Sequence, residues 1–481
     1  MATPIPPNRA SFDAPAVADA TGGRIAAGSP APRAVHGVTT DSRSVVPGSA
    51  FVCLRGEHHD GHDYIDAAIR AGATLLVVEN GRAPAKPPVD VVEVADTLVA
   101  WGALARAHLG AWRRSNAEAR VVAITGSAGK TTTKEFCASL LGTAAECHAT
   151  TGNLNNRVGM PAVALAVEPR HRFAVLEIGM SVPGEIAALA AVAEPDVALI
   201  TNVGLAHAGG VGGTIEAVAL EKGALFAGMR RDGVAVANAD DAAVVAQLGR
   251  ARSARNVLFG LSEASNVRLV RRQALGAEGS RVYVRRADRE SAFVLPIPGE
   301  AAAIDFVAAL AASEAALGAP LDDARIASAL RTLRSIPGRM HVRRLKGEIL
   351  VVDDAYNANP ASVRAALQTL GEIAGGRLVV FLGEMKELGP AAEREHEQLG
   401  NAVASAGVAL LVSCGGLADL TARAAARAGV SVVHAADAAE ASVVGVERIR
   451  GGDRVLVKAS RGVGAERVVD ALVRAHAEEP R

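Results

Sequence analysis

The sequence is poor in aromatic residues and in cysteine. Phe, Trp and Tyr make up 3% of the 481 residues, although half of all residues are hydrophobic. The core must therefore consist mainly of small aliphatic side chains, which suits helices packed on parallel sheets. The four cysteines, Cys53, Cys137, Cys147 and Cys414, have neither metal-ligand spacing nor the pattern of a disulfide framework. We therefore expect a reducing, cytoplasmic location.

The sequence also lacks an excess of charge and any long apolar run. Lysine and arginine number 51, as do aspartate and glutamate, so no net field favours nucleic acid or an acidic membrane surface. No run reaches the roughly 18 apolar residues that a spanning helix needs. The start, MATPIPPNRASF, has no basic region followed by an apolar one. We expect neither export nor a membrane or nucleic-acid partner.

The length indicates about three domains, given ~100–200 residues for each. We expect an α/β protein with a small N-terminal α/β domain, a central parallel-sheet domain and a C-terminal Rossmann-like, doubly wound domain. The first ten or so residues are rich in proline and are expected to be disordered. Alternating runs near Arg281–Val284 predict an antiparallel extension of the central sheet. The predicted domains comprise residues 1–115, 116–335 and 336–481.

The stretch Val121–Lys134, VVAITGSAGKTTTK, predicts a buried strand, a small-residue loop and a helix. Such a loop directs backbone N–H groups and the positive end of a helix at one point. Lys130 adds a cation, and Thr131 adds a hydroxyl suited to Mg²⁺. Ile124 stands where the generic P-loop has its first glycine, so that motif is only partly met. We predict ATP or GTP binding by Gly126, Ser127, Ala128, Gly129, Lys130, Thr131 and Thr132.

Polar side chains follow two further predicted strands. Glu177 ends one strand, and Asn202 and His207 follow the next. Ligands of a doubly wound sheet bind at the carboxyl ends of its strands, so these residues should meet Lys130 and Thr131. Each alone is weak evidence, because a lone carboxylate or histidine is usually an ordinary polar residue. Together with a phosphate loop they predict a Mg²⁺ site.

Lys222 lies in the next helical pattern, within EKGALF. A bare ammonium facing two metal ions would be repelled. Lys222 therefore either points to solvent or is chemically altered.

The motifs GSAGKTT, LEIGM, TNVGLAH and EKGALF, in this order, resemble those of the Mur ligase family. Its members are ATP-dependent enzymes that add amino acids to the peptidoglycan precursor, and they use the shortened phosphate loop. The resemblance implies that Lys222 is carbamylated by CO₂ and becomes an anionic ligand of a second Mg²⁺, beside Glu177 and His207. Thr131 and Glu177 would hold the first Mg²⁺. The implied catalytic residues are Lys130, His207, Lys222 and Arg339.

The resemblance also assigns nucleotide contacts in the C-terminal domain. At one place the sequence departs from the family pattern. It implies that Arg339 reaches the γ-phosphate of ATP and Asp354 the ribose, with Asn202 also near the nucleotide. Family members carry Gly-x-His-Asn-x-x-Asn where this chain has GEAAAID, from Gly299 to Asp305. The missing side chains are associated with adenine contact. That role is not carried over, and Asp305 is at best a substitute.

Asp353–Pro360, DDAYNANP, follows the first strand of the C-terminal domain. This octet, GEMKELG and KASRG resemble the branch that adds D-alanyl-D-alanine to UDP-MurNAc-tripeptide, although Ala459 replaces the usual glycine of that branch. The N-terminal TDSR and DGHD fit its uridine-nucleotide domain, but Asp41 and Arg43 also suit a local ion pair. The implied substrate-binding residues are Asp41, Ser42, Arg43, Asn153, Asn155, Tyr356, Asn357, Asn359, Lys458, Ser460 and Arg461.

The resemblance thus implies a ligase that uses ATP and two Mg²⁺ ions and forms an acyl phosphate. Nothing in the sequence suggests an obligate interface, so we expect a monomer. Two alternatives remain open. One is a sister ATP-dependent ligase, which adds diaminopimelate or lysine or is of the folylpolyglutamate synthetase type. The other is a P-loop nucleotide binder without ligase chemistry.

Overall fold

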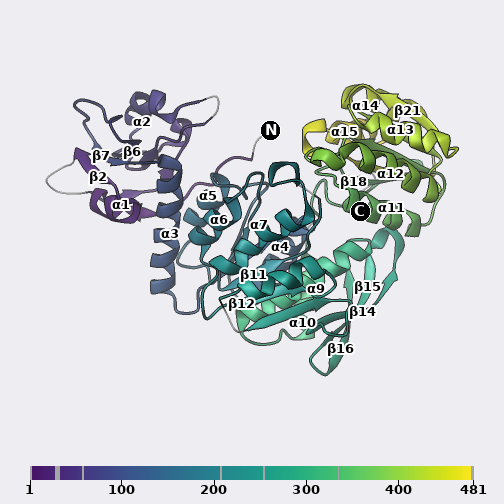
Figure 1. The fold of residues 1–481 in the computed structure, drawn as a ribbon, viewed down its shortest axis with the longest axis horizontal. Coiled ribbons are helices and arrows are strands. Elements are labelled where there is room, and N and C mark those ends of the chain that lie inside the picture. Colours follow the sequence, from purple (N-terminus) through teal and green to yellow (C-terminus); the bar gives the residue numbers. More distant parts are fainter. Residues whose placement is uncertain are drawn as a thin grey trace.

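The computed structural model describes residues 3–27, 33–56, 59–205, 208–252, 255–333 and 335–477. These residues form three successive α/β units, coloured from purple through teal to yellow in Figure 1. The predicted α/β class with three domains is confirmed. None of the helices in the described ranges has the length and apolarity needed to cross a membrane.

The N-terminal domain contains, among its described residues, a five-stranded sheet in the order β2-β7-β6-β5-β4. Its strands are parallel except for β2 at one edge. A short antiparallel pair, β1 and β3, lies beside it. The elements are β1 (Ser11–Phe12), α1 (Ala14–Thr21), β2 (Arg24–Ala27), β3 (Val35–His36), β4 (Val38–Thr39), β5 (Ala50–Val52), α2 (Ile65–Arg70), β6 (Leu75–Glu79), β7 (Asp90–Val94) and α3 (Thr97–Ser115).

Residues 3–10 do not show the disorder that we expected. Asn8 donates from Nδ2 to the Val38 carbonyl at 2.8 Å and accepts the Val38 N–H at 3.0 Å. Ala10 is fully buried, and Thr3 donates to Asn153 of the central domain at 2.6 Å. The expectation is wrong for this segment. Its partners lie far along the chain, and the proline-rich composition of the segment does not reveal them.

The central domain is built on a nine-stranded sheet of described residues, in the order β16-β15-β14-β13-β12-β11-β8-β10-β9. It is parallel from β9 to β14, and β14, β15 and β16 form the predicted antiparallel extension. The strands are β8 (Arg120–Thr125), β9 (Cys147–Ala149), β10 (Phe173–Glu177), β11 (Val197–Ile200), β12 (Val234–Asn238), β13 (Asn256–Gly260), β14 (Val267–Ala274), β15 (Ser280–Arg286) and β16 (Arg289–Leu295). The helices are α4 (Lys130–Gly142), α5 (Gly159–Leu165), α6 (Glu185–Ala193), α7 (Ile215–Gly228), α8 (Ala242–Val245), α9 (Glu300–Leu317) and α10 (Asp323–Thr332).

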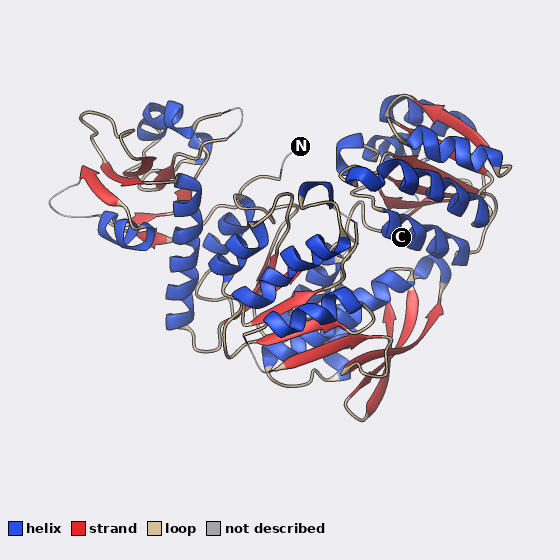
Figure 2. Ribbon diagram, in the orientation of Figure 1, coloured by secondary structure: helices blue, strands red, loops and turns tan. Residues whose placement is uncertain are grey.

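Helices cover both faces of this sheet (Figure 2). Because successive side chains of a strand point to opposite faces, β8 contributes to two cores. Val121 and Ala123 pack with residues of α3, α5, α6 and α7. Val122 and Ile124 pack with residues of α4, α9 and α10. This double burial explains why the strand is apolar throughout and fixes the start of the loop that follows it.

The C-terminal domain has a six-stranded sheet of described residues in the order β17-β18-β22-β19-β20-β21. Only β17 is antiparallel to its neighbour. Apolar runs near residues 349–353, 378–382, 408–412, 431–434 and 454–458 predict the other five strands, whereas the mostly polar HVRRL pattern of β17 predicts none. The elements are β17 (His341–Leu345), β18 (Ile349–Asp354), α11 (Pro360–Glu372), β19 (Leu378–Gly383), α12 (Ala392–Ser405), β20 (Leu410–Cys414), α13 (Ala418–Arg427), β21 (Ser431–Ala435), α14 (Ala438–Arg448), β22 (Arg454–Lys458) and α15 (Glu466–His476).

Candidate functional site

The predicted phosphate loop joins β8 to α4. A Cβ atom at Gly126 would lie 1.8 Å from Thr201 Oγ1, so no other residue fits there. Gly129 has φ +80° and precedes the first turn of α4. In the described part of the chain, no side chain caps this helix start. Its N–H groups are therefore available to an anionic ligand.

The loop after β11 is hydrogen-bonded to the phosphate loop and stabilises it. Asn202 accepts the Ala128 N–H at 2.9 Å through Oδ1 and donates from Nδ2 to the Ala128 carbonyl at 3.1 Å. Thr201 Oγ1 also donates to that carbonyl, at 2.6 Å. Asn202, predicted to bind ATP, thus shapes the loop as well as lining the adjacent cavity.

Glu177 and Thr131 meet at the end of β10, as predicted. Glu177 is 2% exposed. Its Oε2 accepts the Thr131 hydroxyl at 2.9 Å, and its Oε1 accepts Asn155 Nδ2 at 2.8 Å. A buried carboxylate beside a phosphate-loop hydroxyl offers the oxygen donors that Mg²⁺ prefers. His207 lies outside the described residues. Within them, no three His, Cys, Asp or Glu side chains gather into a metal-binding group.

Lys222 does not point to solvent, because it is 1% exposed on α7. Burial lowers the pKa of its ammonium well below the usual value, and Lys130 lowers it further. Burial thus shifts the equilibrium toward the neutral amine, which is the form that can attack CO₂. Of the two choices that the sequence left open, the buried position suits the chemically altered lysine.

Two cavities among the described residues meet at Lys130 and Arg339. The first has a volume of about 490 Å³ and contains the phosphate loop. The second has a volume of about 370 Å³ and lies on the side of Glu177. Residues that line both are Lys130, Arg339, Asn357 and Asn359. Predicted residues that line only the first include Ser127, Thr131, Thr132, Asn202, Asp354 and Lys458. Those that line only the second are Asn153, Asn155, Glu177, Tyr356, Ser460 and Arg461.

Arg339 reaches from the C-terminal domain to the phosphate loop, while its contact with the γ-phosphate of ATP stays a prediction. Its Nη2 donates to Thr131 Oγ1 at 3.3 Å, and its guanidinium lies 4.1 Å from the centre of the Tyr356 ring. Arg461 approaches the same ring at 4.7 Å. Asn359 adds a second link by donating from Nδ2 to the Ser127 carbonyl at 3.3 Å. The C-terminal domain is therefore closed onto the phosphate loop.

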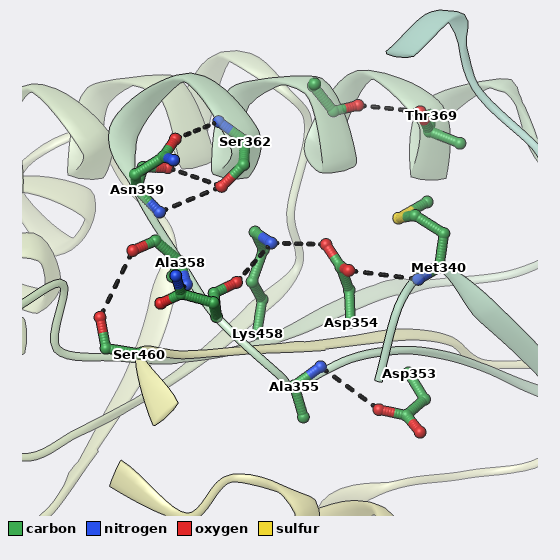
Figure 3. Close-up of polar contacts among 12 residues, drawn as sticks. Met340, Asp353, Asp354, Ala355, Ala358, Asn359, Ser362, Thr369, Lys458 and Ser460 are labelled. Carbon is green, nitrogen blue, oxygen red and sulfur yellow. Dashed lines mark hydrogen bonds and ion pairs between the residues drawn. The ribbon is translucent and has the colours of Figure 1, made fainter. Parts of the chain in front are cut away.

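A buried network positions the turn that carries Arg339 (Figure 3). Asp354 accepts the Met340 N–H at 3.1 Å through Oδ1, and its Oδ2 lies 2.5 Å from Lys458 Nζ. Asp353 accepts the Gly338 N–H at 3.1 Å. Lys458, predicted to bind substrate, therefore neutralises Asp354 at the wall of the first cavity instead of facing the second.

Asp305 lies directly beneath the phosphate loop. Its Oδ1 occupies the place of the missing Gly129 side chain, at 2.1 Å from where a Cβ would stand. Burial raises the pKa of the Asp305 carboxyl to about 8. Ala301 and Ala302, which replace polar residues of the family pattern, line the same cavity.

Two lysines that were given no role belong to the site. Lys134, 1% exposed, donates to the Thr150 carbonyl at 2.6 Å, and Thr150 Oγ1 accepts the Glu177 N–H at 2.9 Å. It therefore fixes the backbone that carries Glu177; its position one helical turn after Lys130 was the available signal. Lys386, within GEMKELG, lines the second cavity, and its N–H donates to Ser460 Oγ at 2.9 Å.

Asp41 and Arg43 form the local ion pair that the sequence left open. Arg43 donates from Nε and Nη2 to the two carboxylate oxygens of Asp41, at 2.9 and 2.7 Å. These bonds lower the pKa of Asp41. Neither of these residues nor Ser42 lines the two cavities described above, so their predicted contact with uridine stays a prediction.

Three family models match successive parts of this chain. The Mur ligase family catalytic domain matches residues 34–108, the Mur ligase middle domain residues 124–313, and the Mur ligase glutamate ligase domain residues 338–461. A relative from Escherichia coli (strain K12), UDP-N-acetylmuramoyl-tripeptide–D-alanyl-D-alanine ligase, is 35% identical over 448 residues, which cover 90% of this chain and 93% of the relative.

Solved structures give the same result. A crystal structure of MurF from Acinetobacter baumannii has a TM-score of 0.85 at 29% identity and covers 98% of this chain and 100% of its own. The MurF ligase from Thermotoga maritima in complex with ADP has a TM-score of 0.79 at 28% identity, with 91% and 97% covered.

Proposed function

This chain belongs to the Mur ligase family, and we propose from that premise that it joins D-alanyl-D-alanine to UDP-MurNAc-tripeptide at the expense of ATP. The E. coli relative is named for this reaction. The observation in the structure that carries the proposal is the meeting of two cavities at Lys130 and Arg339. One cavity suits a nucleotide, and the other suits the carboxylate that its γ-phosphate must reach.

A carboxylate is a poor acyl donor, so the reaction proceeds in two steps. The terminal carboxylate oxygen of the tripeptide attacks the γ-phosphorus of ATP, the bond to the β-phosphate oxygen breaks, and ADP leaves. The amine of D-alanyl-D-alanine then attacks the carbonyl of the acyl phosphate. It loses a proton, phosphate leaves and an amide bond remains. Catalysis of such a transfer rests on alignment and on neutralisation of charge.

The chain supplies alignment and charge neutralisation at the junction of the two cavities. The N–H groups at the start of α4 bind the phosphates, while Lys130 and Arg339 neutralise charge on the transferred phosphoryl group. Lys130 Nζ donates to the Gly126 carbonyl at 2.8 Å, a bond that it exchanges for phosphate oxygens. Because Arg339 belongs to the C-terminal domain, domain closure completes the site.

The donors described above fit Mg²⁺. Thr131 and Glu177 would hold one ion, and Glu177, His207 and carbamylated Lys222 would hold a second. Bound Mg²⁺ would neutralise phosphate charge and act as a Lewis acid. The neutral form of the buried Lys222 amine would attack CO₂ and lose a proton to form the carbamate. The side chain would then carry the negative charge that a metal ligand requires.

The second cavity accepts the peptide substrates. Arg461 and Lys386 line its wall together with Ser460, and they suit the carboxylate of D-alanyl-D-alanine. The N-terminal domain, with Asp41, Ser42 and Arg43, binds the uridine nucleotide. One chain supplies all of these parts, so we expect a monomer that acts in the cytoplasm, where ATP and the nucleotide precursor occur.

The deciding experiment measures phosphate release from ATP with UDP-MurNAc-tripeptide, with D-alanyl-D-alanine, with both and with neither. We expect sustained release only with both substrates and formation of the pentapeptide product. Activity with single amino acids in place of the dipeptide would instead identify a sister ligase. Release that needs neither substrate would contradict ligase chemistry altogether.

A further inference from the structure

The N-terminal arm, which we define as residues 3–9, connects the two domains that the proposed function assigns to the nucleotide-linked peptide. In Figure 1 the chain start lies above the central domain, away from the rest of the purple domain. Between Thr3 and Asn8 the chain makes five residue steps, which span at most roughly 17 Å when extended. Pro4, Pro6 and Pro7 restrict this segment, so little conformational entropy is lost when it is held in place.

One end of the arm is attached to the turn before Asp41, Ser42 and Arg43. We call these predicted uridine-binding residues the uridine loop. Asn8 makes hydrogen bonds to both the N–H and the carbonyl of Val38, at 3.0 and 2.8 Å. The Gly37 N–H donates to the Ala10 carbonyl at 2.8 Å. The chain then continues from Val38 directly through β4 to Asp41. The arm is thus fixed to the backbone that positions the predicted uridine-binding residues.

The other end is attached to the loop that carries Asn153 and Asn155 and lines the second cavity. We call it the cavity loop. Thr3 Oγ1 donates to Asn153 Oδ1 at 2.6 Å. Gly152 has φ +56°, and a Cβ there would lie 2.3 Å from Thr3 Oγ1. Any larger residue at position 152 would therefore displace the arm. Ile5 anchors the segment between these ends by packing against the core shared by the N-terminal and central domains.

The Thr3 bond determines how the Asn153 amide presents itself. An asparagine amide has an accepting oxygen at one end and a donating nitrogen at the other. Because Oδ1 accepts the Thr3 hydroxyl, the amide presents Nδ2, for which the described residues supply no acceptor. Donors on a cavity wall suit carbonyl, carboxylate or phosphate oxygens of a ligand. The arm therefore prepares Asn153 to donate to an acidic substrate.

We propose that the N-terminal arm is part of the site for the nucleotide-linked peptide, with Thr3 orienting Asn153 and the arm fixing the cavity loop relative to the uridine loop. This inference rests on the proposed function. It assigns Thr3 as a positioning residue for one substrate only, because Asn153, to which Thr3 is hydrogen-bonded, lines the second cavity and not the cavity that holds the phosphate loop. ATP binding should not depend on the arm.

The test compares the full chain with Thr3→Val and with a deletion of residues 2–7, which retains Asn8. Calorimetry with UDP-MurNAc-tripeptide should give about 5- to 10-fold weaker binding for Thr3→Val, as expected for one lost hydrogen bond, and weaker binding still for the deletion. The KM for this substrate should rise correspondingly, whereas kcat and the KM for ATP stay within about twofold. Thr332→Val is the matched control, because the Thr332 hydroxyl bonds only to carbonyls of its own helix among the described residues.

The outcomes separate the two proposals. Equal affinity in the wild type and both variants would show that the arm has no part in the site. Tighter binding after deletion would show that the arm obstructs it, which also overturns the inference. A proportional loss of kcat and of ATP affinity would indicate a general structural role instead. If the wild-type chain itself fails to bind UDP-MurNAc-tripeptide, the proposed function fails, and the inference fails with it.

Discussion

Lys222 shows how burial changes the chemistry of a single residue. Its amine lies inside the central domain, where the charged form is disfavoured. A lysine that remained an ammonium would oppose the cationic groups of the site. The same residue carrying a carbamate would add a negative charge where phosphate and metal ions meet. Burial thus accounts for both the reactivity of this residue and its proposed role.

Lys222→Ala should lower kcat by about 100-fold or more, because removal of one positioned charged group from such a site costs this much. Short-chain carboxylic acids should restore part of the activity, since they can supply the missing anion. Phosphate release with both substrates measures the effect. Lys346→Ala, at an exposed lysine, should keep full activity. A Lys222→Ala variant as active as wild type would contradict the carbamate.

Asp305→Asn should stabilise the protein. The margin, which is the free energy of unfolding of the variant minus that of the wild type, should grow with pH. The pKa of Asp305 is raised to about 8 in the folded chain, whereas an unfolded aspartate ionises near about 3.9. Between these values the folded state binds the extra proton, so stability falls as the pH rises. The margin should grow by up to about 1.4 kcal/mol per pH unit.

Urea unfolding at pH 5 and pH 8 measures this margin for Asp305→Asn. The exposed Asp288 provides the control, since Asp288→Asn should give no margin that changes between the two pH values. An Asp305→Asn margin that is equal at both pH values would mean that Asp305 is already ionised in the folded protein.

At the scale of elements, the ends of β18 and β22 support the turn that carries Arg339. Asp354 at the end of β18 and Lys458 at the end of β22 lie side by side in the sheet. Their ion pair is almost fully buried. Through the Met340 N–H, Asp354 holds the turn on which Arg339 is carried. The two strand ends therefore fix the position of Arg339 at the junction of the two cavities.

Lys458→Met should destabilise the chain by about 3–5 kcal/mol, because it leaves the Asp354 charge buried without a partner. Lys458→Met combined with Asp354→Asn should recover much of this loss, since the neutral amide can still accept the Met340 N–H. The midpoint of urea unfolding measures both variants. A double variant no more stable than Lys458→Met would show that packing of the lysine, and not its charge, matters here.

At the scale of the whole molecule, the C-terminal domain is closed onto the phosphate loop of the central domain. Besides the Arg339 and Asn359 contacts, ion pairs join the antiparallel extension of the central sheet to the C-terminal domain. Arg272 pairs with Glu372, and Glu278 pairs with Arg344. The Gly209 N–H also donates to the Glu387 carbonyl at 3.1 Å. These contacts join the central domain to the C-terminal domain and favour the closed arrangement.

Arg272→Glu should open this arrangement, because it replaces a largely buried attraction by repulsion from Glu372. We expect a larger radius of gyration in X-ray scattering and a KM for ATP raised by about 5- to 10-fold, equivalent to roughly 1–1.4 kcal/mol. The charge swap Arg272→Glu with Glu372→Arg should restore both quantities. A swap that behaves like the single variant would show that the pair does not control closure.

The comparisons confirm the family that the motifs indicated. Elements with a strong local pattern were predicted well, among them β8, α4 and the five parallel strands of the C-terminal domain. Their apolar periodicity is a property of neighbouring residues and can be read without a structure. The polar edge strand β17 was missed because nothing in its local pattern distinguishes it from a loop.

The sequence by itself determined the residue types of the site and the order in which they occur. It placed Glu177 at a strand end, and Lys130 and Thr131 at the start of the helix that follows the phosphate loop, and the parallel topology then required them to meet. Only the tertiary structure decided that Lys458 neutralises Asp354, that Lys134 supports Glu177 and that Thr3 reaches Asn153. The reason is physical: periodicity and turn chemistry act over a few residues, whereas these contacts join residues far apart in the chain, whose distance is set by packing and domain closure.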